Sequence, residues 1–201
     1  AGVVAGAITL DDDIEAIDLG GSQRAALSAV TQAVDRVRAG GGNALVLAAD
    51  NRKTRAGSQQ ELDYGDAAAA LLIGSDQVLA EYLGSGSLSV DFVDHFRASG
   101  EEVDYQWEER WVRDEGIGKL APQAIAAALK QAGVPAAQVD HFIFPSTFAK
   151  MDAQLAKACG IRPEAVAEAM LQSPAFLFWM ETTPRPDWKP WSARCRRWRQ
   201  R

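Results

Sequence analysis

The sequence predicts a layered α/β fold with a largely central sheet. Helix-like and strand-like segments alternate along the chain. Two of the strand-like segments, within 43–50 and 64–74, are continuous apolar runs, which are typical of strands buried on both faces. The 201 residues are enough for one or two modest domains, and a composition of 47% hydrophobic and 24% charged residues can build a core.

The first third of the chain predicts two strands and one helix. Residues 3–9 are a short apolar strand candidate, and residues 14–19 form a weaker one. From 22 to 39, apolar residues recur three and four positions apart, which predicts an amphipathic helix. Ser22 is a suitable N-cap for this helix, and Gly40–Gly42 would end it.

The middle of the chain predicts sheet. The apolar run at 43–50 is followed by a polar loop and then by the turn and strand of 64–74. Residues 77–93 alternate around a Gly-Ser turn, which predicts strand, turn and strand. Residues 94–118 are charged and aromatic, and we expect them to be irregular with a surface helix.

The last patterned part alternates helix and strand again. Residues 120–133 predict a strong helix that ends at the glycine of position 133. A strand is expected at 139–144, followed by a helix at 147–160. Residues 162–170 begin another helix, with proline at its first turn.

Composition excludes several function classes. The net charge is −6, but residues 173–201 carry +5 and residues 1–172 carry −11, and an acidic body disfavours general nucleic-acid binding. No apolar run approaches the roughly 20 residues of a membrane helix, and the start of the chain lacks a basic leader. Two cysteines are too few for a disulfide framework, so we expect a reducing, cytoplasmic location.

Metal and cofactor motifs are not recognisable in the sequence. The two cysteines and two histidines, Cys159, Cys195, His95 and His141, are scattered without paired ligand spacing, so zinc is not expected. No phosphate-binding loop or dinucleotide fingerprint occurs. We therefore expect no resident cofactor.

The C-terminal stretch 173–201 differs from the rest of the chain. It holds four of the six tryptophans and four of the eight prolines, and it follows neither helical nor strand periodicity. One interpretation is a basic, aromatic arm for nucleic acid or a membrane surface. The preferred one is a shifted reading frame of a GC-rich gene.

Four segments of the chain together resemble parts of one known family. DLGGSQRAALSAVTQAVDRVRAGGGNALVLAAD resembles the nucleophile helix and the following strand of the thiolase superfamily, and YGDAAAALLIG resembles a glycine-rich strand in its branch of ketoacyl-ACP synthase III and hydroxymethylglutaryl-CoA synthase. DFVDHFR with YQWEERWVRDEG is similar to a substrate-side insertion. VDHFIFPSTFAKMDAQLAKACGI is similar to the segment that carries the catalytic histidine.

The resemblance implies a thiolase-like layered fold (α-β-α-β-α) that is incomplete. Residues 1–90 would be the remainder of the N-terminal half, and residues 91–172 part of the C-terminal half. The atypical tail is 173–201. The chain therefore looks like a fragment of a thiolase-like protein.

The resemblance also implies a thiolate nucleophile at a helix N-terminus, where the helix dipole lowers the pKa of the thiol. Ungapped alignment puts Gln23 in the cysteine slot and Ser22 one residue before it. Three interpretations stay open: helix capping, contact of the Gln23 amide with a thioester carbonyl, and Ser22 as the nucleophile. The family offers two precedents for glutamine here, namely decarboxylating loading synthases and subunits that have lost condensation.

The histidine slot of the family falls at Ser146, or at Pro145 under the hydroxymethylglutaryl-type spacing, and neither replaces an imidazole. His141 is interpreted as structural, whereas His95 either faces a substrate tunnel or is solvated. The asparagine loop of the family is not recognisable. The candidate site residues are therefore Gln23, Ser22 and Ser146.

Trp107 and Trp111 lie four residues apart, so they either line an acyl tunnel or pack the insertion on the core. By resemblance, the protein handles acyl thioesters, with acyl-CoA or acyl-carrier protein as substrate rather than cofactor. Whether it is an active enzyme is open, because the catalytic cysteine and histidine are both missing. The alternatives are a non-catalytic subunit, paired with a thiolase-like or zinc-binding accessory protein, and a non-functional gene fragment. The family also implies a dimer.

Overall fold

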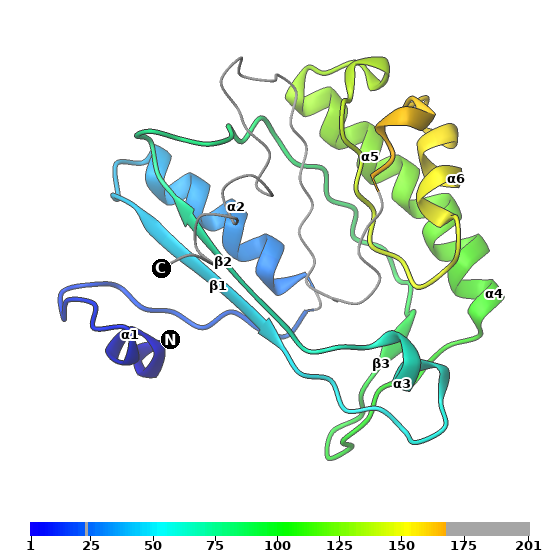
Figure 1. Ribbon diagram of the computed structural model, residues 1–201, viewed down its shortest axis with the longest axis horizontal. Coiled ribbons are helices and arrows are strands. Elements are labelled where there is room, and N and C mark those ends of the chain that lie inside the picture. The colour runs from blue at the N-terminus through cyan, green and yellow to red at the C-terminus, as the bar shows by residue number, and fades with distance from the viewer. Residues whose placement is uncertain (23, 168–201) are drawn as a thin grey trace, which may run out of the picture. The chain divides into compact units, whose positions relative to one another are not determined.

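The computed structural model describes residues 1–22 and 24–167 of the chain. These residues form two compact units (Figure 1). The first unit holds Ala1–Tyr82 and Gly100–Val103, and the second holds Leu83–Ser99 and continues from Asp104. The expected tail at 173–201 lies outside the described residues, and the predicted division at residues 90 and 172 stays a prediction.

The first unit is a two-stranded antiparallel sheet with a helix on one face. Strand β1 (Ala44–Asp50) pairs with β2 (Ala67–Ile73), in a register that places Val46 opposite Leu71. Helix α2 (Ala25–Arg38) packs on this sheet, as Figure 1 shows. Two short helices complete the unit, α1 (Gly2–Ala7) and α3 (Gln59–Asp63).

The strands at 43–50 and 64–74 were predicted correctly, but their burial on both faces is wrong for this structure. Val46 is buried on the side of α2. The other face carries leucines and alanines, and Leu72 on it is 71% exposed. Opposite residues of an antiparallel pair share a face, so Leu45 and Leu72, which are partners in the register, belong to the same apolar surface.

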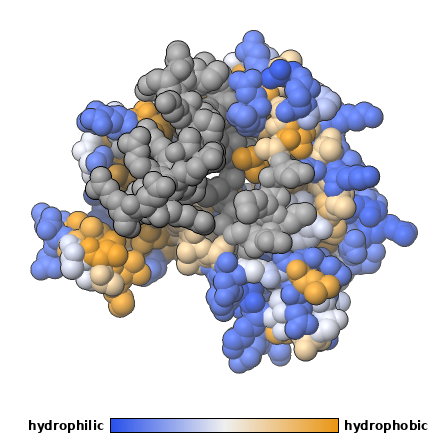
Figure 2. Space-filling view, viewed as in Figure 1, coloured by the Kyte–Doolittle hydropathy of each residue, from blue (hydrophilic) through white to orange (hydrophobic). Residues whose placement is uncertain are grey.

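The start of the chain differs from the prediction. The apolar run at 3–9 forms helix α1 instead of a strand, and no strand occurs at 14–19. Periodicity cannot distinguish strand from helix in so short an apolar run. Figure 2 shows the apolar side chains of α1 gathered at the surface on its left side, and Val3 is 90% exposed.

The second unit is built around one long helical segment. Helix α4 (Glu109–Trp111), the π-helix η1 (Val112–Ile117) and helix α5 (Gly118–Ala132) follow one another without a break. The carboxylate of Glu108 begins the segment by accepting from the amides of Arg110 at 3.0 Å and Trp111 at 2.7 Å. Gly133 ends it in the left-handed conformation with φ of 68°, as predicted for the helix at 120–133.

The remaining elements of this unit are short. Strands β3 (His95–Phe96) and β4 (Tyr105–Gln106) pair antiparallel. After α5 come the 3₁₀-helix η2 (Ala136–Gln138), helix α6 (Met151–Ala158) and the 3₁₀-helix η3 (Pro163–Ala165).

The core of the second unit lies between α5, α6 and the segments that flank them. Phe142, Leu155 and Val139 are each only 1% exposed. The buried cluster consists of Ile125, Leu129, Val139, Phe142, Met151, Leu155, Ala156, Ile161 and Ala165. The expected strand at 139–144 is reduced to one parallel bridge, in which Phe142 N donates to Ala165 O at 2.7 Å and Ala167 N donates to Phe142 O at 3.0 Å.

The segment at 77–93 is not the predicted strand, turn and strand. Residues 81–90 instead form neither helix nor strand, and Gly84 and Gly86 lie against α5. A Cβ atom built on Gly86 would lie 2.1 Å from Ala124 O and 2.6 Å from Ala128 N. Ser85 N donates to Gln131 Oε1 at 2.8 Å. The glycines therefore allow a close approach to the helix, rather than the turn that the pattern indicated.

This close approach predicts a strong effect of a single methyl group. The variant Gly86→Ala should lower the free energy of unfolding by about 1–3 kcal/mol, because its Cβ overlaps backbone atoms that cannot move away cheaply. Urea unfolding followed by circular dichroism measures the change. Gly6→Ala is the matched control, since nothing lies within 4 Å of a Cβ at Gly6. Equal stabilities of the two variants would contradict the packing.

Candidate functional site

The start of α2 is the first region where the sequence predicts site residues. Ser22 is exposed, and its Oγ accepts from the amide of Arg24 at 3.3 Å. Ala25 N donates to Ser22 O at 3.0 Å, and Arg24 occupies the N-cap position. Ser22 therefore forms a local turn just before the helix rather than its predicted cap, because its side chain bonds only two residues ahead. Gln23 lies outside the described residues.

Ser146 lies in the second unit, in the loop between the Phe142 bridge and α6. It is partly buried, and its Oγ accepts from the amide of Phe148 at 3.0 Å. The hydroxyl hydrogen of a serine remains able to donate when its oxygen accepts in this way. Ser22 and Ser146 thus belong to different units, and each accepts a hydrogen bond from a backbone amide two residues ahead.

The histidines take different positions from those expected. The side chain of His95 is only 16% exposed, and its Nδ1 lies 3.1 Å from Asp94 Oδ2, so the expectation of a solvated His95 is wrong. Burial raises the pKa of Asp94, but hydrogen bonds and charge from His95 outweigh this, so that the pKa is lowered overall. His141 is exposed, beside the buried Phe142.

Cys159 is the free cysteine among the described residues. It follows the last residue of α6 and packs against the core of the second unit. Burial raises the pKa of its thiol. A thiol at a helix C-terminus lacks the dipole that stabilises a thiolate, so Cys159 is not placed as a nucleophile.

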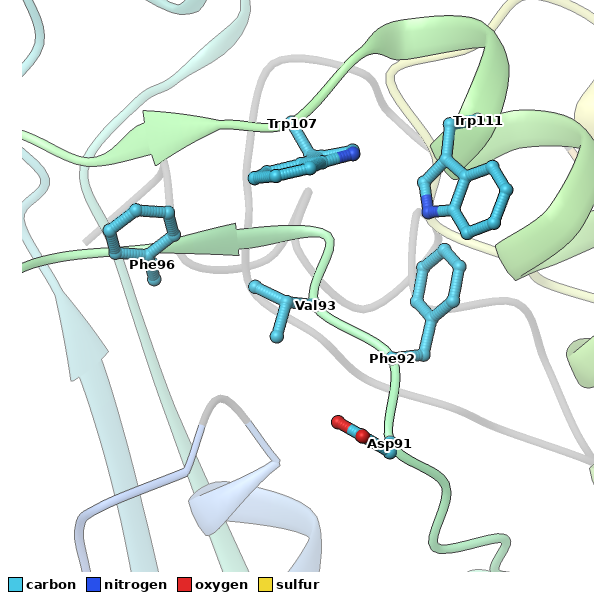
Figure 3. A pocket seen from close by; sticks show the side chains of 6 residues that line it. All are labelled: Asp91, Phe92, Val93, Phe96, Trp107 and Trp111. Atoms are coloured by element: carbon cyan, nitrogen blue, oxygen red, sulfur yellow. The ribbon is translucent and has the colours of Figure 1, made fainter.

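The described residues form an apolar pocket in the second unit (Figure 3). It is open to solvent, has a volume of about 410 Å³ and is lined by Asp91, Phe92, Val93, Phe96, Trp107 and Trp111. Trp107 lies above Val93, with Phe96 on one side and the pair of Phe92 and Trp111 on the other. The two tryptophans that the sequence singled out therefore do line a pocket. His95, two residues from Val93, does not.

Sequence reasoning missed Asp91, Phe92, Val93 and Phe96. Aromatic residues make up only 8% of the chain, yet five lie between positions 92 and 111. This local concentration of aromatic residues is the sequence signal that indicates a pocket. The pocket itself forms through tertiary contacts, such as the stacking of Phe92 on Trp111 with ring centroids 5.9 Å apart.

Metal and membrane features are not evident in the part of the chain that the structure describes. Within 1–22 and 24–167, no three His, Cys, Asp or Glu side chains are grouped closely enough to hold a metal ion. None of the described helices has the length and apolar character needed to cross a bilayer.

Comparisons with known proteins point to one fold. Neither a family model nor a curated sequence matches the chain. The 3-oxoacyl-(acyl carrier protein) synthase III of Pseudomonas aeruginosa is similar in structure, with a TM-score of 0.70 and 17% identity over 86% of this chain. Xanthomonas campestris OleA, in a structure with bound lauric acid and lauroyl-CoA, has a TM-score of 0.70 and 19% identity over 86% of this chain.

A third similar structure is MvaS in complex with 3-hydroxy-3-methylglutaryl coenzyme A, with a TM-score of 0.63 and 20% identity over 77% of this chain. The chain spans 57% of the synthase III, 57% of OleA and 41% of MvaS.

The state of Cys159 can be tested by alkylation. With Cys195 replaced by serine, iodoacetamide at pH 7.5 should modify Cys159 more slowly in the native protein than in the unfolded protein, because burial raises the pKa of its thiol and so lowers the thiolate fraction. The rate should rise with pH through a pKa above that of a free thiol. The same protein unfolded in urea is the control. Equal rates in the native and unfolded protein would show that Cys159 is not shielded.

The resemblance read from the sequence is thus confirmed at the level of the fold, and the chain has the thiolase-like α/β fold of these structures.

Proposed function

We propose that the chain handles acyl thioesters, as acyl-CoA or acyl-carrier protein, without forming a covalent acyl-enzyme. The observation that supports this most is the likeness of 86% of the chain to a structure with bound lauroyl-CoA. The synthase III and MvaS names also refer to acyl carrier protein and to a coenzyme A thioester. In this proposal the chain keeps the acyl-binding scaffold but lacks the thiolate.

In this proposal, side-chain donors replace covalent chemistry. Gln23, in the cysteine slot by resemblance, would donate its amide hydrogen to the thioester carbonyl. Ser146 can donate its hydroxyl hydrogen, because its oxygen already accepts from Phe148 N. Either donor alone would polarise a carbonyl, as a group of an oxyanion site does, but neither residue transfers an acyl group. Ser22 is the alternative nucleophile, but no histidine or carboxylate that would activate it stands among its described contacts.

Titration and mass spectrometry test the proposal together. The 201-residue chain should bind lauroyl-CoA reversibly in calorimetry, and its intact mass should not change after incubation. Gln23→Ala should weaken binding about fivefold, which corresponds to the loss of one hydrogen bond. Gln23→Cys should become acylated, whereas Gln138→Cys, on the exposed helix η2, should not. Acylation of the unmodified chain, or no binding of acyl-CoA at all, would contradict the proposal.

We also propose that the chain pairs with a second copy of itself through an apolar face of the first unit. The outer face of β1 and β2 supports this, because it exposes Leu45, Leu47 and Leu72 to solvent. An accessory thiolase-like or zinc-binding subunit is the alternative occupant of this face.

A cytoplasmic location stays a prediction from the two cysteines.

Sedimentation velocity tests the pairing. Leu72→Lys should shift the chain from dimer towards monomer, because it puts a charge into the apolar face. Leu62→Lys is the matched control, since Leu62 is 81% exposed on α3, outside that face. A monomeric unmodified chain would contradict self-pairing and favour the accessory subunit.

The remaining alternative, a non-functional fragment, makes a different prediction. Such a chain would unfold without a cooperative transition, because apolar surface that is left uncovered does not specify one packed state. Calorimetric melting of the 201-residue chain therefore separates the two cases. A single sharp transition excludes the fragment interpretation, and its absence supports it.

A further inference from the structure

The pocket of the second unit combines aromatic walls with a net negative charge. Trp107 and Trp111 are 48% and 47% exposed, so large aromatic surfaces face the opening. In Figure 3 the flat face of Trp107 is turned toward Val93, across the space that the pocket encloses. An aromatic face carries negative charge from its π electrons, and it attracts a cation placed above it.

The walls are held in place by backbone contacts. Trp107 N donates to Asp94 O at 2.9 Å, and Trp111 N donates to the Glu108 carboxylate. The Phe92 ring lies over Gly116 of the π-helix, where a Cβ atom would come within 2.6 Å of it. π-Helical turns are rare and are often found at functional sites. The glycine and the widened turn together leave room for Phe92 beside Trp111.

Further rings extend the same wall. Phe96 and Tyr105 are paired across β3 and β4 with centroids 5.3 Å apart. The rings of Tyr105 and Trp107 are T-shaped, with centroids 6.4 Å apart and an angle of 72° between their planes. The aromatic surface is thus continuous from Phe96 to Trp107, which makes it a built feature rather than one stray exposed residue.

The charge around the pocket is negative. Within 91–99 and 104–111, the segments of this unit that form the pocket, five carboxylates stand against two guanidinium groups. Arg97 is paired with Asp104 at 3.7 Å. Among the described residues, no hydrogen bond or ion pair engages the Asp91 side chain, which lies at the pocket. A carboxylate ligand would meet repulsion here, whereas a cation would find complementary charge.

We propose that this pocket binds an organic cation, namely a quaternary ammonium group that carries a short alkyl chain. Its methyl groups would contact the face of Trp107 and the part of Trp111 that Phe92 leaves exposed, and Asp91 in the pocket lining would supply complementary charge. A hydrated metal ion does not fit a pocket whose lining is mainly apolar, and a fatty carboxylate has the wrong charge. This site does not depend on acyl-thioester binding, so either proposal can fail alone.

The test compares two ligands of similar size and opposite charge. Hexyltrimethylammonium should bind the 201-residue chain at least tenfold more tightly than heptanoate in isothermal titration. Both probes are too short to act as detergents at the concentrations used. If heptanoate binds equally well or better, the proposal is overturned, and the pocket is simply apolar.

Three variants locate the interaction. Asp91→Asn should reduce hexyltrimethylammonium affinity about fivefold and leave heptanoate binding unchanged or improved. Trp107→Leu keeps an apolar wall but removes the aromatic face, so it should reduce the preference for the cation and retain heptanoate binding. Asp76→Asn is the matched control, since Asp76 is an exposed carboxylate of the first unit.

The control separates a specific site from general attraction to an acidic protein of net charge −6. Unchanged affinity in Asp76→Asn, together with a loss in Asp91→Asn, supports the site. If both variants lose affinity equally, or if Trp107→Leu keeps the full preference for the cation, the assignment of this pocket is wrong.

Discussion

The close approach of Gly84 and Gly86 to helix α5 is the constraint on which the second unit depends. A Cβ atom at Gly86 would overlap the helix backbone, so the connection can follow this path only with glycine. The path determines where Phe92 arrives, and Phe92 in turn needs the space that Gly116 leaves in the π-helix. The absence of a side chain at Gly86 and at Gly116 thus positions the aromatic wall. The buried cluster around Phe142 and Leu155 stabilises α5 and α6.

The two loops in which the sequence predicts site residues lack the groups of a condensing enzyme. A condensing enzyme needs a thiolate and an imidazole, whereas the described loops present Ser22 and Ser146, each bonded to a nearby backbone amide. The described cysteine lies at the wrong end of a helix and has a raised pKa. Hydrogen bonding to a thioester fits the side chains of these loops better than covalent transfer, and this is why we propose binding without an acyl-enzyme.

Local patterns predicted the long elements well. Helical spacing and a glycine stop located α5, and apolar runs located β1 and β2, because these signals arise within the segments themselves. The errors lie where tertiary packing decides. The alternation at 77–93 indicated strands, but its glycines instead allow close contact with α5. The apolar run at 3–9 was too short for periodicity to distinguish helix from strand. At the site, the sequence indicated Trp107 and Trp111, but Asp91 and Phe92 become pocket residues only through contacts distant in the chain.

The central claim is that an acyl thioester can bind this chain and remain intact. Carbon-13 NMR of lauroyl-CoA labelled at the carbonyl tests it directly, because thioester and oxygen-ester carbonyls resonate at different positions. The account predicts one thioester resonance that broadens or shifts on addition of the chain and returns when unlabelled lauroyl-CoA displaces it. A new resonance that remains with the protein after displacement would show covalent transfer and contradict the account.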